Sequence, residues 1–365
     1  TLLTFINSKD DERNIAEGKL DYLFDDILHV KLGIFMKFYN LVTGLLSHKP
    51  LQVLLFRSKK MRNLIKKINE TNPQDISICH MIRASEYQVL IKADRKLIEL
   101  TDSLSLNFAR KTQNYGDKTL ANFVYKFIYS IEAKRLKEAE IECLETNDKV
   151  VLVSDVDRDF ILAERKEDDP LNNKLTTIPL GIPDEFFSAP LEDYDPHTIV
   201  FVGKMDYEPN EKAVIHFVKY ILPLVKLIIP NVRFKIVGAV PSDRVKKLSQ
   251  NDPSITVTGR VDSIIDHVSN AALSVALMQS GAGMQTKILE SLALGVPVVT
   301  NKLGLEGIDL VPNVDLMVAA DDNEAAKVIS DLISNRTHRQ KLSIEGQKAV
   351  FNKYSSSKIF TDYIS

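Results

Sequence analysis

Apolar residues along the chain form short continuous runs that alternate with stretches of helical periodicity. Continuous runs of this length are typical of strands that helices cover on both faces. In the first half, the pattern predicts strands at 1–6, 53–58, 76–80, 96–102, 149–155 and 175–181. Predicted helices lie between them, most clearly at 20–46, 61–69 and 107–146, the last with a break near Gly116. This repetition predicts a parallel α/β sheet.

The polar, proline-bracketed stretch 189–197 is predicted to be a linker between two domains. After it the alternation restarts, with strands expected at 198–203, 233–238, 255–259, 273–278, 296–300 and 315–319 and closing helices at 323–335 and 338–353. Six strands in βα order predict a Rossmann-like, doubly wound domain. We therefore expect domains at 1–190 and 196–353, and a tail at 354–365 that packs back on the first domain.

Composition narrows the class of protein. A chain of 365 residues, 44% hydrophobic, is long enough for two domains, and its net charge of −2 gives no support for nucleic acid binding. Cys79 and Cys143 lack metal-ligand spacing, which favours buried thiols in a reducing compartment and a cytoplasmic protein. The apolar segment 27–46 is interrupted by charged side chains, so it is not a predicted transmembrane helix.

The stretch 276–301 contains the clearest candidate chemistry. Glycines at 281 and 283 predict a turn, a helix follows from Met284, and Lys287 and Glu290 share a face of its first turns. A helix N-terminus behind glycines favours a phosphate, which a lysine would also attract. A carboxylate one turn later can accept hydrogen bonds from ribose hydroxyls. The residues alone equally allow a surface Lys–Glu pair on an ordinary helix.

Three segments carry a resemblance to a known family: FVGKMDYEPN (201–210), VTGRV (257–261) and GAGMQTKILESLALGVPVV (281–299). They resemble the retaining glycosyltransferases of family 4 (group 1), in particular bacterial exopolysaccharide-type sugar transferases, including those of PEP-CTERM gene clusters. A looser likeness at 80–87, 100–110, 150–160 and 178–184 extends it over most of the chain. The resemblance implies the GT-B fold, with two Rossmann-like domains facing a cleft. It also implies sugar transfer from a UDP- or GDP-linked donor to a saccharide or lipid-linked acceptor, without a metal or resident cofactor.

The resemblance also assigns roles to individual residues. It places the donor beside Gly203, Lys204, Gly259, Arg260, Val261, Gly281, Gly283, Met284, Gln285, Lys287 and Glu290. Within that set Lys287 faces the phosphates and Glu290 binds the ribose. On the acceptor side it implies His80, Arg83 and Asp102, so that Lys287, Asp102 and His80 are the catalytic candidates. His80 can equally be structural, and Asp102 can equally be the N-cap of a helix that starts near Ser103.

The chain also departs from the family pattern. Ala282 stands where the first glutamate of the family's paired motif is expected, and relatives begin with a further strand and glycine loop before the 1–6 strand. We therefore expect a first domain truncated at the front. Asp155 and Asp157 spell a DxD motif, interpreted as incidental because it lies at the end of a first-domain strand and not in the donor domain. A non-catalytic GT-B binding subunit and a nucleotide-sugar epimerase remain as alternatives.

Lysines and aromatic residues are mixed between residues 31 and 67. This mixture predicts a peripheral contact with the inner face of a membrane, where lipid-linked acceptors are found. A solvated helix over a covered core explains it equally.

Overall fold

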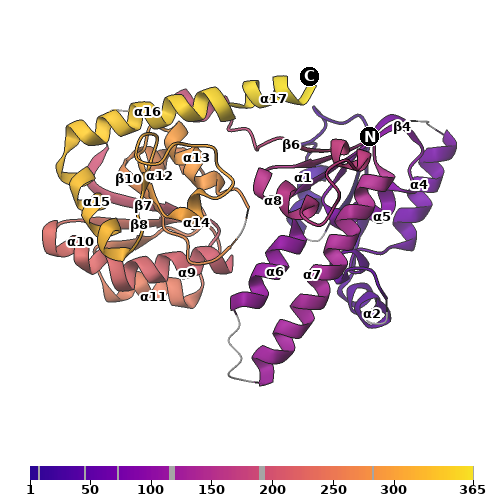
Figure 1. The fold of residues 1–365 in the computed structure, drawn as a ribbon, viewed down its shortest axis with the longest axis horizontal. Helices are drawn as coiled ribbons and strands as arrows, with labels where there is room; N and C mark the ends of the chain where they lie inside the picture. The colour runs from indigo at the N-terminus through magenta and orange to yellow at the C-terminus, as the bar shows by residue number, and fades with distance from the viewer. Residues whose placement is uncertain are drawn as a thin grey trace. The chain divides into compact units, whose positions relative to one another are not determined.

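The computed structural model describes residues 1–6, 9–44, 47–71, 74–114, 120–188, 194–281 and 283–364 (Figure 1). The chain divides into two compact units, the first formed by 1–152 and 158–177 and the second by 153–157 and 178–365. The predicted boundaries at 190 and 196 and the docking of the tail stay predictions. Most of the predicted linker lies outside the described residues, and its last three residues belong to a strand.

The second unit contains a six-stranded parallel sheet in the order β12-β11-β10-β7-β8-β9. Its strands are β7 (Asp195–Val202), β8 (Arg233–Val237), β9 (Ile255–Val257), β10 (Ala271–Ala276), β11 (Val298–Thr300) and β12 (Met317–Val318). The chain starts in the middle at β7, builds outward to β9, and then returns to add β10 on the other side of β7. This is the Rossmann order, and its topological switch point lies between β7 and β10. The predicted doubly wound α/β fold is therefore confirmed for this unit.

Alternating side chains of the central strand explain its continuous apolar sequence. Ile199 and Phe201 pack into a core with β8, α9 and α15, whereas Val200 and Val202 pack on the opposite face with α12. The helices of the unit are α9 (Glu208–His216), α10 (Leu222–Ile228), α11 (Asp243–Asn251), α12 (Ile264–Ser269), α13 (Thr286–Ala293), α14 (Lys302–Leu305), α15 (Asp322–Ser334), α16 (Arg336–Tyr354) and α17 (Ser356–Ile364). A π-helical turn, Phe217–Ile221, joins α9 to α10. Because both faces are covered, positions 199–202 of β7 are all apolar.

The first unit contains two parallel sheets, β1-β2 and β3-β4-β5-β6. The strands are β1 (Leu2–Ile6), β2 (Ile27–Lys31), β3 (Gln74–His80), β4 (Ala93–Thr101), β5 (Lys149–Leu152) and β6 (Leu175–Thr177). The helices are α1 (Lys9–Ala16), α2 (Ile34–Gly44), α3 (Leu51–Leu54), α4 (Lys59–Thr71), α5 (Ser85–Gln88), α6 (Leu104–Asn114), α7 (Leu120–Thr146) and α8 (Asp155–Leu162), the last of which starts in the second unit. The predicted break near Gly116 lies outside the described residues.

Two predictions for the first half are wrong. The predicted helix 20–46 contains strand β2, which pairs with β1, and only its second part is helical. The predicted strand 53–58 is helix α3 followed by a turn. The cause is remote in sequence: the buried carboxylate of Glu132, on α7, accepts hydrogen bonds from the amides of Leu51 and Gln52 at 3.0 and 3.1 Å. An anionic cap at these free amides stabilises a helical turn that the local sequence does not specify.

Candidate functional site

Glycines follow three central strands at the carboxyl edge of the second sheet. Gly203 follows β7 and Gly238 follows β8, with φ of +157° and +156°, and Gly281 and Gly283 follow β10 with φ of +120° and +83°. A Cβ atom on Gly238 would lie 1.8 Å from the carbonyl oxygen of Gly203. The backbones of these two loops are therefore in contact beside the switch point.

Lys287 connects the two sides of that switch point. It lies in the first turn of α13, and its Nζ donates to Asn210 Oδ1 at 2.5 Å and to Gln285 Oε1 at 3.3 Å. The same ammonium lies 5.0 Å from the centre of the Phe201 ring. Because Asn210 belongs to α9 and Phe201 to β7, the lysine holds the β10–α13 turn against the β7–α9 loop.

Burial lowers the pKa of Lys287 to about 8, and the nearby carboxylate of Glu290 offsets only part of this effect. None of the ion pairs formed by the described residues includes this ammonium, whose hydrogen-bond acceptors are two amide oxygens and, at 3.9 Å, the sulfur of Met278. A desolvated cation without a carboxylate within ion-pair distance destabilises a fold, and such groups cluster at functional sites. The arrangement suits an anionic ligand that supplies the missing charge.

The stability of the protein is expected to report this desolvation directly. The folded-state pKa of Lys287, about 8, lies below the ordinary value of 10.5, so between these values the unfolded chain binds more protons. Stability therefore rises with pH across that window, by about 3 kcal/mol in all for this one group. We expect the unfolding free energy of the wild type to rise relative to that of Lys287→Met between pH 8 and pH 10.5. A difference that stays constant with pH would contradict the lowered pKa.

Glu290 lies one turn further along α13 and is half-buried. Burial raises the pKa of its carboxyl group, while Lys287 lowers it to a smaller extent. Within the part of the chain that the structure describes, this carboxylate makes no hydrogen bond. Its acceptor capacity is therefore available to hydroxyl groups of a ligand.

The start of α13 is not capped by a side chain, although the amides of Thr286 and Ile288 donate to the carbonyl oxygens of Met284 and Gln285 at 3.1 and 2.9 Å. Its N-cap residue, Gln285, makes no side-chain capping hydrogen bond and instead donates from Nε2 to the carbonyl oxygen of Gly283 at 3.2 Å. The side chain of Met284 packs against the apolar core, so only its backbone can face a ligand. First-turn amides without a capping side chain favour an anion. Ala282, the predicted departure from the family pattern, lies outside the described residues.

The remaining predicted donor residues lie in loops at the same edge. Lys204 is exposed and forms an ion pair with Asp206 at 3.1 Å. Gly259 has a φ of +71° with open space around it, and Arg260 beside it is exposed, whereas Val261 packs against the core. The fold thus brings the loops after β7, β9 and β10 to one sheet edge, although the ligand contacts of these residues stay predictions.

Sequence reasoning missed Asn210 and Gly238. Asn210 is 5% exposed, accepts from Lys287 and donates from Nδ2 to the carbonyl oxygen of Lys204 at 3.0 Å. A polar residue after a proline in the YEPN segment was a usable signal, but its partner is 77 residues away. Gly238 follows an apolar run as an ordinary strand-ending glycine would, and only its contact with Gly203 reveals its role.

The predicted acceptor-side residues lie where β3 and β4 of the first unit end. His80 Nδ1 lies 3.1 Å from Glu99 Oε2, and Arg83 Nε donates to Gln52 Oε1 at 3.1 Å. The interpretation of Asp102 as an N-cap is wrong, because the hydroxyl of Ser103 accepts from the amide of Leu106 at 3.1 Å. Ser103 caps the helix, as hydroxyl side chains commonly do.

Two residues at these strand ends have unusual backbone geometry. Met81 and Thr101, which are not glycines, have φ of +70° and +68°. Such strain is most often retained at functional sites. The ends of β3 and β4 are therefore reasonable places for a site, and the roles of His80, Arg83 and Asp102 stay predictions.

The DxD motif has a structural explanation. Asp155 and Asp157 lie in the first turn of α8 and not at a strand end, and residues 153–157 belong to the second unit and not the first, which corrects the placement on which the interpretation rested. Ser154 Oγ accepts from the amide of Asp157 at 3.3 Å and donates to Asp157 Oδ2 at 2.9 Å. Ser154 therefore caps α8, and Asp157 orients the capping hydroxyl.

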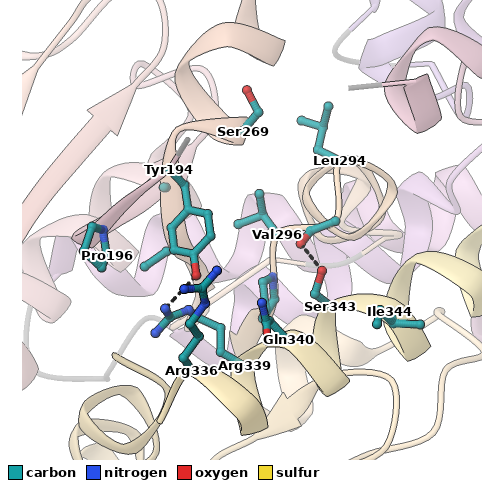
Figure 2. A pocket seen from close by; sticks show the side chains of 14 residues that line it. Tyr194, Pro196, Ser269, Leu294, Val296, Arg336, Arg339, Gln340, Ser343 and Ile344 are labelled. Carbon is teal, nitrogen blue, oxygen red and sulfur yellow. Dashed lines mark hydrogen bonds between the residues drawn. The ribbon is translucent and has the colours of Figure 1, made fainter. Parts of the chain in front are cut away.

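A cavity of about 740 Å³ lies at the opposite, amino edge of the second sheet (Figure 2). The guanidinium of Arg339 faces it but donates to the carbonyl oxygens of Leu332 and Ile333 at 2.6 and 2.8 Å and to the hydroxyl of Tyr194 at 2.7 Å. Arg339 therefore caps the C-terminus of α15. None of the predicted site residues lines this cavity.

Residues 196–335 match the sequence profile described as glycosyl transferases group 1. This match covers the strands and loops that form the site. The second unit contains a group 1 glycosyltransferase domain. A relative along most of the chain is an uncharacterized 44.6 kDa protein in the cps region of Klebsiella pneumoniae. The two are 21% identical over an alignment of 346 residues that covers 91% of this chain and 81% of that protein.

Solved structures of glycosyltransferases share the fold of this chain. Anabaena Alr3699/HepE, in complex with UDP and glucose, superposes with a TM-score of 0.66 at 13% identity. The match covers 100% of this chain and 98% of the HepE chain. A mutant of S. aureus TarM, in complex with fondaparinux, alpha-GlcNAc-glycerol and UDP, superposes with a TM-score of 0.62 at 15% identity. That match covers 83% of this chain, which spans only 57% of the TarM chain. The predicted GT-B class of fold is confirmed.

Proposed function

We propose that this chain is a retaining glycosyltransferase that moves a sugar from a UDP- or GDP-linked donor to a saccharide or lipid-linked acceptor. The observation that carries the proposal is Lys287, a half-buried lysine whose desolvated ammonium is held by amide oxygens beside the 281–283 turn and the start of α13. A diphosphate would supply the negative charge that this position lacks. The UDP and sugar ligands in the HepE and TarM structures support a donor of this class.

In the proposed reaction, the bond between the anomeric carbon and the diphosphate breaks as the acceptor hydroxyl approaches from the same face. Negative charge then grows on the leaving diphosphate, and the acceptor proton passes to it. Lys287 and the first amides of α13 stabilise that charge, so a divalent metal is not required. We assign His80, Arg83 and Asp102 to the acceptor or the transferred sugar, where positioning supplies the rest of the acceleration.

A role in exopolysaccharide synthesis in the bacterial cytoplasm is part of the proposal. Its support is the Klebsiella pneumoniae relative, which is described by its position in a cps region. The retaining outcome rests on the sequence resemblance described above.

A donor panel tests the function. The purified chain is incubated with UDP-, GDP- and ADP-sugars, with and without saccharide acceptors and EDTA, and products are followed by mass spectrometry and NMR of the anomeric proton. Transfer with retained configuration that persists in EDTA is the expected result. Donor binding without turnover would instead support a binding subunit, and an epimerised free donor would support an epimerase.

Glu290→Gln is expected to raise KM for the donor by roughly 10–100-fold with a smaller effect on kcat. The variant weakens hydrogen bonds to the ribose, which are present before and during the reaction. Steady-state kinetics with varied donor measure the effect, and Glu345→Gln on α16 serves as a matched control. An unchanged KM in the Glu290 variant would remove the ribose assignment.

A further inference from the structure

A long cationic segment lies in the first unit. Between residues 27 and 69 the chain has nine lysines and arginines and no aspartate or glutamate, although its total net charge is −2. Some of these cations pair with acids from other segments, as Lys31 does with Glu12 and Lys49 with Glu142. Four exposed lysines of α4 have no ion-pair partner among the described residues: Lys59, Lys60, Lys66 and Lys67. This excess charge favours an anionic partner.

Helix α2, within that segment, has an inverted polarity. Its buried residues are Asn40 and Gly44, and Asn40 Nδ2 donates to the carbonyl oxygen of Arg57 at 2.9 Å. Six large apolar side chains point to solvent, with Phe35 88% exposed: Ile34, Phe35, Met36, Phe38, Tyr39 and Val42. A helix that buries an asparagine and exposes its aromatic side chains is missing a partner.

The first three turns of α7 have the same character. Their exposed apolar side chains are Leu120, Phe123, Val124, Tyr125, Phe127, Ile128 and Ile131. At 100° per residue these positions cover an arc of about 200°, much wider than a stripe that packs on one neighbouring helix. Figure 1 shows this end of α7 projecting from the body of the first unit. Burial of α7 begins only at Glu132.

The two helices flank one short element. Glu132 binds the amides that start α3, and α2 packs against α3. We call the exposed apolar side chains of α2 and of residues 120–131 the α2–α7 surface. Each part contains a single charged residue, Lys37 or Lys126, and no acid.

We propose that the α2–α7 surface inserts into the interfacial layer of an anionic lipid bilayer. The described chain has no helix that is both long and apolar enough to cross a membrane. A wide apolar arc rich in aromatic rings suits a fluid phase that surrounds it. The exposed lysines of α4 add long-range attraction to the lipid phosphates. The hypothesis of membrane contact through residues 31–67 thus narrows to α2 and the lysines of α4. The start of α7, residues 120–131, is added as a second membrane contact.

Vesicle flotation tests the inference without any donor or acceptor. The intact chain is mixed with vesicles of phosphatidylcholine alone or with added phosphatidylglycerol. We expect flotation with the anionic vesicles and much less with phosphatidylcholine alone. The variants Phe35→Ser/Phe38→Ser and Phe123→Ser/Phe127→Ser are each expected to lower partitioning by about tenfold or more. Leu227→Ser on α10, which removes a side chain 82% exposed in the second unit, is the matched control and should float as wild type does.

Other outcomes would overturn the inference. No flotation of the wild type, equal flotation on both vesicle types, or unchanged flotation of both phenylalanine variants each contradicts it. A wild-type oligomer in sedimentation that the same variants dissociate, without vesicle binding, would assign the surface to a second copy of the chain. Lys287→Met should float as wild type does, because flotation does not depend on the donor site. Failure of the donor assay can therefore be told apart from failure of the flotation assay.

Discussion

Replacing Lys287 with methionine is expected to lower kcat for sugar transfer by about 10²–10³-fold while the protein stays folded. Methionine keeps most of the side-chain volume against Phe201 and removes only the charge. The ammonium interacts more strongly with the leaving diphosphate as negative charge grows, so kcat falls more than donor affinity does. Initial rates at saturating donor, together with a donor binding measurement, separate the two.

Lys246→Met is the control for this prediction. Lys246 lies on α11, exposed and paired with Asp243 at 3.4 Å, so its loss removes a charge of the same sign away from the site. Wild-type rates are expected for it. If the Lys287 variant also kept full activity, the ammonium would have no part in the transfer, and the proposed site would lie elsewhere.

Gly238→Ala is expected to destabilise the second unit by about 3–5 kcal/mol and to abolish donor binding. The φ of +156° is unfavourable for alanine, and the new Cβ would lie 1.8 Å from the carbonyl oxygen of Gly203. Neither loop can easily move away, because each follows a strand buried in the middle of the sheet. Hydrogen exchange of the β7 and β8 backbone amides in urea measures the loss of stability in the two strands that the substitution affects.

Gly259→Ala separates backbone strain from the contact between loops. Its φ is +71°, and a Cβ there meets open space, so only the conformational penalty of about 1–2 kcal/mol applies. Equal destabilisation by the two alanine substitutions would show that the close approach of Gly203 and Gly238 contributes little.

The strands of the second unit could be predicted because each is an apolar run that ends at a glycine or a polar turn. Burial on both faces makes such runs continuous, and the glycines mark their carboxyl ends. In the first unit the same reasoning failed at 53–58, where a short apolar run fits a strand or a buried helical turn equally well. Glu132 decides between them from about 80 residues away, and no local pattern contains that information.

The sequence by itself determined that the 281–290 segment is a glycine turn followed by a helix with Lys287 and Glu290 on one face. Those are local properties of spacing and backbone preference. Only the tertiary structure decided that Lys287 is desolvated against Phe201, that its ammonium is held by Asn210, and that Gly203 meets Gly238. The burial and the lowered pKa of Lys287 arise because β7 and β10 become neighbours at the switch point. The packing of the whole sheet determines that pairing.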